Sequence, residues 1–176
     1  MWLLPSVLIW RRIAPCLNHR LRERPTKVTL ASKEVTFMAT RPHRLVPMAH
    51  VSDVEKSIEF YEAIGLQVGD RVQIGGRTTW ASMTCGQTRL FLVAASGPID
   101  AEQQAVLFYL HCERLAELRS QLIAGGFKDG GRFGEAGATP AGPGVVYEMT
   151  YPFYMPEGEF RVYDPDGYCL LIGQCA

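Results

Sequence analysis

The sequence lacks an excess of either charge, a long apolar run and a paired cysteine motif. It has 18 Lys and Arg against 18 Asp and Glu in 176 residues. Its apolar stretch at residues 1–10 is too short to cross a membrane, which takes roughly 20 residues. The five cysteines form no CxxC pair and no regularly spaced even set, so we expect free thiols in a reducing cytosol rather than a zinc site or a disulfide framework.

The balanced charge hides a difference between the two ends of the chain. Residues 1–37 hold seven Lys and Arg and two Asp and Glu, which leaves 11 basic and 16 acidic residues in the rest. An acidic balance is not typical of a nucleic-acid surface, which needs clustered basic side chains. We therefore expect neither a nucleic acid nor a membrane among the partners.

Residues 1–43 are predicted to be an extension outside the folded domain. Residues 11–37 are basic and show no clear periodicity, a composition compatible with an organellar presequence, a poor signal peptide or a misassigned start. We favour a misassigned start, with the true one near Met38. The chain is 47% apolar, enough for one well-buried domain, which we place at residues 44–174.

Within this domain one order of elements occurs twice. Residues 45–51 are strand-like, and residues 52–65 follow with apolar residues at helical spacing, Ser52 and Glu55 in a capping-box pattern, and Gly65 at the expected end. Further strands are predicted at 67–74, 78–84 and 88–94, with Gly-containing turns between them.

The second half repeats this order. A strand at 105–112 and a helix at 113–126 precede predicted strands at 145–151, 159–163 and 168–172, and a shift of 61 residues places His111 on His50. Any α+β domain could show such an order by chance. A strand-helix-three-strand unit cannot bury its helix and sheet alone, however, so we favour two βαβββ modules, at about 44–96 and 105–174, that share one core.

Both ends of the domain resemble a known family. The motif V-x-D-x-x-x-S-x-x-F-Y, which opens the first module of glyoxalase/bleomycin resistance/extradiol dioxygenase proteins, is matched by Val51, Asp53, Ser57, Phe60 and Tyr61, and Asp164–Gly167 resembles the D-P-D-G of their last hairpin. The resemblance to this vicinal oxygen chelate superfamily implies an α+β fold of two βαβββ modules that form a cup-shaped mixed sheet with flanking helices. It also implies a ligand on the concave face and, commonly, a homodimer.

The resemblance further identifies the positions where metal-dependent members carry His and Glu ligands. These positions are Val46, Phe91, Val106 or Leu107, and Leu171. Apolar side chains cannot coordinate a cation. We therefore expect no metal and no other cofactor, which puts in doubt the family's thiohemiacetal isomerisation, ring-cleaving dioxygenation and thiol addition to fosfomycin.

Strand alternation predicts which residues line the cup, because residues two apart share a face. The candidate ligand-binding residues are Met48, His50, Trp80, Phe91, Tyr109, His111, Tyr147, Tyr154 and Leu171. Their aromatic rings suit a planar or apolar ligand. The alternative is that Trp80, Phe91, Tyr109 and Tyr147 only fill the core.

Other polar residues have weaker claims to the site. His50 and His111 could bind a metal at a displaced site, act as a base or contact a ligand, but a His at a strand end is more often structural. A carboxylate among Glu148, Glu157 and Glu159 could contact a cationic ligand or serve as a base, although most surface glutamates do neither. Arg89 and Arg161 could recognise an anion, although cross-strand pairing with Glu is commoner. The Gly- and Pro-rich residues 129–144 are interpreted as a lid over the cup or as a disordered insertion.

These predictions favour a cytoplasmic, metal-free, homodimeric protein that binds an amphipathic or aromatic small molecule, an antibiotic being one version. No catalytic residue is assigned. The alternatives are a metal-dependent lyase or dioxygenase with a displaced metal site, and a structural module whose cup is filled.

Overall fold

The computed structural model describes residues 28–30, 33–35 and 44–175 and divides the chain into two units, Met1–Arg44 and Leu45–Ala176. In the first unit, β1 (Val28–Leu30) pairs antiparallel with β2 (Lys33–Val35). The expected start near Met38 lies outside the described residues. None of the helices formed by the described residues is long and apolar enough to span a membrane.

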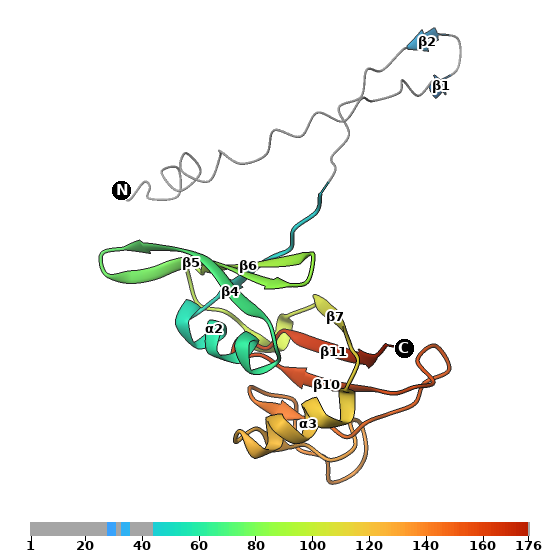
Figure 1. Ribbon diagram of the computed structural model, residues 1–176. Coiled ribbons are helices and arrows are strands. Elements are labelled where there is room, and N and C mark those ends of the chain that lie inside the picture. Colours follow the sequence, from blue (N-terminus) through green and yellow to red (C-terminus); the bar gives the residue numbers. More distant parts are fainter. Residues whose placement is uncertain (1–27, 31–32, 36–43, 176) are drawn as a thin grey trace. The chain divides into compact units, whose positions relative to one another are not determined.

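The second unit contains two mixed sheets and two α-helices (Figure 1). The first sheet has the order β3-β6-β5-β4, with β3 (Met48–Val51), β4 (Gln67–Ile74), β5 (Arg77–Cys85) and β6 (Thr88–Ala94). The second has the order β7-β11-β10-β9-β8, with β7 (Leu107–Cys112), β8 (Lys128–Asp129), β9 (Val145–Val146), β10 (Glu159–Tyr163) and β11 (Cys169–Gln174). Helix α2 (Val54–Ala63) follows β3, α3 (Leu115–Ala124) follows β7, and the 3-10 turn η1 (Ala101–Gln103) lies between the modules. The predicted α+β class is confirmed.

The register of the strands repeats between the two modules. In each, the first strand is parallel to the last, so that Met48 lies opposite Phe91 and Tyr109 lies opposite Leu171. Met48 and Tyr109 are 61 residues apart, the shift that the sequence predicts. The two modules are therefore equivalent at the level of individual backbone partners.

The second module departs from the first in its outer strands. The strand predicted at 145–151 is reduced to the two residues of β9, and residues 128–129 form the extra strand β8, parallel to β9. Beyond β9, Thr150 and Glu159 form only an isolated bridge. Pro152 has no backbone N–H to donate, so it cannot extend the pairing beyond this bridge.

The capping of α2 also differs from the prediction. Asp53, not Ser52, is the N-cap residue, and its side chain accepts hydrogen bonds from the backbone N–H groups of Glu55 at 3.0 Å and Lys56 at 3.3 Å. Ser52 instead donates its backbone N–H to Asp166 Oδ1, 3.0 Å away. Aspartate is as good an N-cap as serine, so the helix begins one residue later than the capping-box pattern suggests.

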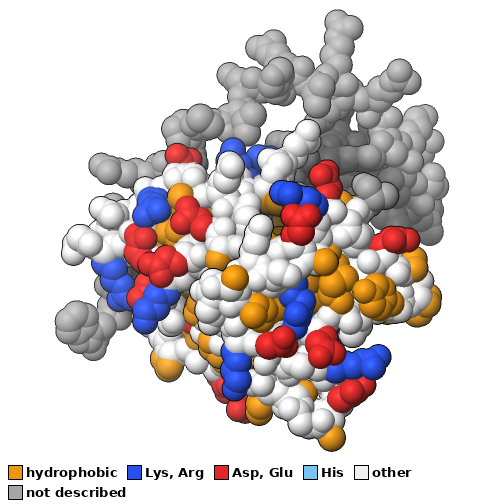
Figure 2. All heavy atoms as spheres, turned by 60° about the horizontal axis from the view of Figure 1, so that its bottom comes forward, with side chains coloured by type: hydrophobic (Ala, Val, Ile, Leu, Met, Phe, Trp, Pro, Cys, Tyr) orange, Lys and Arg blue, Asp and Glu red, His pale blue; other side chains and the backbone are white. Residues whose placement is uncertain are grey.

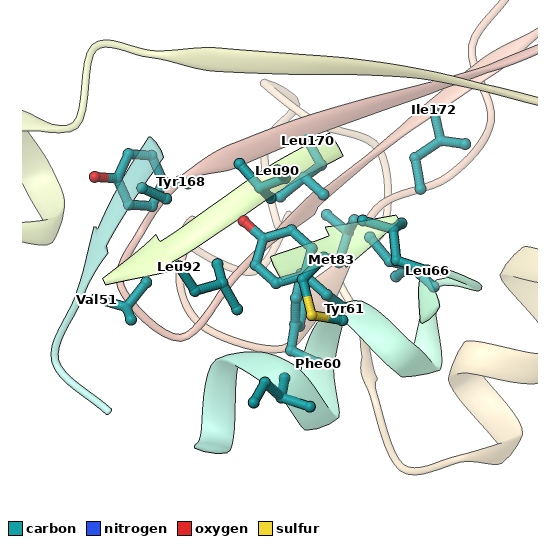
Figure 3. Packing of buried hydrophobic residues seen from close by; sticks show 14 of the residues in the cluster. Val51, Phe60, Tyr61, Leu66, Met83, Leu90, Leu92, Tyr168, Leu170 and Ile172 are labelled. Atoms are coloured by element: carbon teal, nitrogen blue, oxygen red, sulfur yellow. The ribbon is translucent and has the colours of Figure 1, made fainter. Parts of the chain in front are cut away.

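The core lies between the two sheets (Figure 3). Residues from the first sheet such as Leu92, from α2 such as Tyr61, and from β11 such as Leu170 belong to one buried cluster. Helix α2 packs against β4, β5 and β6, and its Tyr61 reaches Asp164, which follows β10. Val54, Ile58 and Tyr61 are buried, as the helical spacing predicts.

A buried polar network ties the D-P-D-G turn to the first module. Asp164 is fully buried and accepts hydrogen bonds from the Tyr61 hydroxyl at 3.1 Å, from the Asp166 N–H at 2.9 Å and from the Tyr168 N–H at 2.8 Å. Burial raises the pKa of the Asp164 carboxyl to about 6, although these hydrogen bonds oppose the rise. The turn is therefore part of the buried contact between the two modules rather than a surface loop.

The raised pKa of Asp164 predicts a pH dependence of stability. The folded protein holds this proton more tightly than the unfolded chain, whose pKa is near 3.8. The contribution is complete below pH 3.8 and is lost as the pH rises through about 6. Asp164→Asn cannot titrate at this position. Between pH 4 and pH 7 we therefore expect the wild type to lose up to about 3 kcal/mol more of its free energy of unfolding than Asp164→Asn does. Urea unfolding of both proteins across this range measures the difference, with Asp70→Asn at an exposed position as control; a constant difference contradicts the prediction.

Candidate functional site

The predicted lining residues divide between two surfaces, which we call the outer faces of the first and second sheets. Met48, His50, Trp80 and Phe91 alternate with core residues of the first sheet. Tyr109, His111, Tyr147 and Leu171 do the same in the second sheet, and Tyr154 follows in the loop before β10. Because the other side of each sheet belongs to the shared core, the two outer faces lie on opposite sides of that core.

The outer face of the first sheet is aromatic. The rings of Trp80 and Phe91 are 4.9 Å apart between centroids, and Met48, opposite Phe91, is 42% exposed. Trp80 is buried without belonging to the core cluster, and its indole N–H has no hydrogen-bond partner among the described residues. A buried donor without an acceptor is unfavourable, so an acceptor on a bound molecule would stabilise it.

The outer face of the second sheet contains a buried carboxylate. Glu159 is 3% exposed and accepts hydrogen bonds from the hydroxyls of Tyr109 at 2.8 Å and Tyr154 at 2.9 Å. Burial, followed by the hydrogen bond to Glu159, raises the pKa of Tyr109 to about 12, and the hydrogen bond to Glu159 raises that of Tyr154. Both phenols therefore remain neutral donors at physiological pH.

A second group on this face surrounds Arg161. Its guanidinium lies 4.4 Å from the centre of the Phe133 ring, and Phe133 packs edge-on against Tyr147 at 5.0 Å. Burial raises the pKa of the Cys169 thiol and that of Tyr163, the latter to about 12. Tyr147 is 1% exposed and donates its hydroxyl to the Thr139 carbonyl at 2.8 Å. Its buried ring therefore packs under Phe133 and offers no surface to a ligand.

The two histidines are not brought together. His50 is exposed and lines a cavity of about 480 Å³ with Tyr168 and residues 95–100, 103 and 104. His111 lines a separate cavity of about 420 Å³ with the ends of both helices, and its ring is 5.3 Å from that of Tyr109. The structure therefore gives no geometric support to a joint His50–His111 site.

Residues 129–144 form a hydrogen-bonded loop rather than a free insertion. The Gly130 N–H donates to the Val146 carbonyl at 2.8 Å, and the Glu148 N–H donates to Gly131 at 2.8 Å. Arg119 pairs with Asp129 at 2.7 Å at the start of the loop. The loop brings Phe133 onto the outer face of the second sheet, which the sequence did not predict.

The positions where a metal would be expected do not fit one. Phe91, Leu107 and Leu171 supply only carbon atoms, and Val46 precedes β3 with no donor either. Across the described part of the chain, no group of three or more His, Cys, Asp or Glu is arranged to hold a metal ion. The four cysteines of this part, Cys85, Cys112, Cys169 and Cys175, are free thiols.

These features match a known superfamily. Residues 43–171 match the family described as Glyoxalase/Bleomycin resistance protein/Dioxygenase superfamily. The chain belongs to this superfamily. No curated protein matches it.

Solved structures of the superfamily have the same fold at low sequence identity. A bleomycin resistance determinant encoded on the transposon Tn5 is 20% identical, with a TM-score of 0.56, over 76% of this chain and 98% of that one. The bleomycin-binding protein from Streptomyces verticillus, solved with copper(II)-bleomycin, is 16% identical, with a TM-score of 0.54, over 78% and 100%. TnmS3, an antibiotic binding protein from Streptomyces sp. CB03234, is 19% identical, with a TM-score of 0.50, over 78% and 99%.

Apolar side chains remain exposed on and around the outer faces. Large exposed ones include Met48, Val106, Leu107, Tyr109, Tyr151, Phe153 and Tyr154. In the view of Figure 2, groups of hydrophobic side chains lie between acidic and basic side chains, and the two signs of charge are interspersed. Contiguous exposed apolar surface is typical of places where a ligand or another protein binds.

Proposed function

We propose that this superfamily member is a metal-free binding protein that holds an amphipathic or aromatic small molecule against the outer faces of its sheets. The observation that carries the proposal is that an apolar side chain occupies every position where a metal ligand would be expected. In addition, Trp80 and Phe91 form an aromatic pair, and the Trp80 indole N–H has no hydrogen-bond partner among the described residues. Such a surface offers stacking area and a hydrogen-bond donor but no Lewis acid. The similarity to bleomycin-binding and antibiotic-binding proteins supports an antibiotic as one candidate ligand.

We further propose that the binding cup is completed by a second copy of the chain. The outer faces lie on opposite sides of one core, so a single chain does not enclose a ligand between them. Strands β3 and β7 are edge strands of the described sheets, and Met48 and Leu107 beside these edges are 42% and 57% exposed. A homodimer would cover this apolar surface and place the first sheet of one protomer near the second sheet of its partner.

Thermal unfolding with a panel of candidate ligands tests the binding function. The panel contains bleomycin, planar aromatic compounds without charge, and cationic and anionic aromatic compounds, each added to chelator-treated protein. A ligand at about 100 times its Kd should stabilise the fold by about 2.7 kcal/mol, which raises Tm by several degrees. An unchanged Tm with every compound would contradict the binding function and favour a structural module whose cup is filled.

A further inference from the structure

Glu159 is unusually well buried for an acidic residue on the outer face of a sheet. It is 3% exposed, and none of the ion pairs that join described residues involves it. A buried carboxylate without a cationic partner is costly unless hydrogen bonds or a nearby positive charge compensate it. Two neutral phenols, from Tyr109 and Tyr154, are the side chains that donate to it. A carboxylate can accept about four hydrogen bonds, so the compensation is incomplete.

The contact with Tyr109 depends on a specific glycine. Tyr109 is on β7 and Glu159 is on β10, and β11 lies between these two strands. Gly173 is the β11 residue opposite Glu159, and a Cβ atom there would lie 2.5 Å from the Tyr109 hydroxyl oxygen and 2.9 Å from Met155 Cε. The absence of a side chain at Gly173 therefore lets Tyr109 reach across one strand to the carboxylate. The arrangement is built into the sheet.

Both tyrosines remain partly exposed while their hydroxyls contact the carboxylate, although the Tyr109 ring packs against His111 and the Tyr154 ring against Phe153. Tyr109 is 42% exposed and Tyr154 is 56% exposed. A phenol that donates to an anion becomes richer in π-electron density, and its ring face then attracts a cation more strongly. The nearest basic residue along the strand, Arg161, is engaged with the Phe133 ring, 4.4 Å from its centre. Arg161 also acts electrostatically on Tyr154, where it opposes the rise of the pKa, but it forms no ion pair with Glu159. The carboxylate behind the two rings therefore has no salt-bridge partner among the described residues.

We propose that Tyr109 and Tyr154, held on the buried Glu159 carboxylate, form a recognition site for an ammonium group of the ligand. This inference rests on the proposed binding function and adds the charge of the ligand to it. The cation packs against the ring faces, and the buried carboxylate supplies the negative charge behind them. The aromatic surface elsewhere on the outer faces takes the remaining, uncharged part of the molecule.

The test compares two small probes of the same shape, choline and its neutral carbon analogue 3,3-dimethylbutan-1-ol, with the full chain. NMR titration follows the ring signals of Tyr109 and Tyr154 and gives a Kd for each probe. We expect the wild type to bind choline at least about 10-fold more tightly than the neutral analogue, and Glu159→Gln to reduce this preference to less than about twofold. Glu157→Gln, which removes an exposed carboxylate two residues away, should keep the preference.

Two further variants keep the test decisive if Glu159→Gln does not fold. Tyr109→Phe and Tyr154→Phe keep the rings and remove the hydroxyls that contact the carboxylate, so each should weaken choline binding several-fold without affecting the neutral analogue. Equal affinity of the wild type for both probes, or an unchanged preference in Glu159→Gln or in both phenylalanine variants, would overturn the cation site. Neutral aromatic compounds from the panel that still stabilise Glu159→Gln would show that the general binding function holds independently.

Discussion

Replacement of Leu170 by alanine is expected to lower the free energy of unfolding by about 3–5 kcal/mol. Leu170 is fully buried on β11 and belongs to the cluster that joins the two sheets and α2 (Figure 3). Removal of its side chain leaves a cavity at the place where both modules meet. Urea unfolding followed by circular dichroism measures the change.

The matched control for this truncation is Leu45→Ala. Leu45 is 93% exposed, so loss of its side chain should change the free energy of unfolding by less than about 0.5 kcal/mol. A loss of under about 1 kcal/mol in Leu170→Ala would mean that the two modules do not share the close-packed core described above.

Substitution of Leu107 by aspartate is expected to raise the dimer dissociation constant by at least about 100-fold. The proposed homodimer covers Leu107, which is 57% exposed in the single chain and lies on the edge strand β7. A carboxylate there would be buried without a partner, and twofold symmetry would impose the cost twice. Sedimentation equilibrium over a range of concentrations measures the constant.

Ile74→Asp controls for the general effect of an added charge. Ile74 is 52% exposed, close to the value of Leu107, but it lies on β4, at the edge of the first sheet away from β3. Its substitution should leave the dissociation constant within about twofold of the wild-type value. Equal effects of the two substitutions, or a wild-type chain that is monomeric at high concentration, would contradict the proposed assembly.

Much of the fold could be predicted because its signals are local. The strands at 67–74 and 88–94 have the predicted bounds, and the 61-residue shift reappears as equivalent partners in the two parallel strand pairs. The cap of α2 was misassigned because Ser52 and Asp53 are both good capping residues. The local sequence also does not show that the Ser52 backbone N–H donates to Asp166, which is 114 positions away. The shortened β9 depends in the same way on pairing that no local pattern encodes.

The candidate site was less predictable. Alternation placed Met48, Phe91, Tyr109 and Leu171 on the faces opposite the core, as the structure has them. It could not show that Tyr147 is covered by Phe133, because that contact depends on the path of a loop. Nor could it show that Tyr109 reaches Glu159, since the contact joins residues 50 positions apart across an intervening strand. The only sequence signal near this contact was that Glu159 and Arg161, two residues apart on one predicted strand, lie on the same face of the sheet.

The central claim is that the protein binds an aromatic or amphipathic molecule without a metal, and isothermal titration tests it most directly. The compound of the panel that raises Tm most is titrated into protein treated with chelator and, separately, into protein incubated with Fe, Mn, Ni, Co or Zn. The account predicts the same Kd, within about twofold, in all titrations. Binding that appears only after one metal has been added, in proportion to the metal held per chain, would contradict it and favour a metal-dependent enzyme with a displaced site.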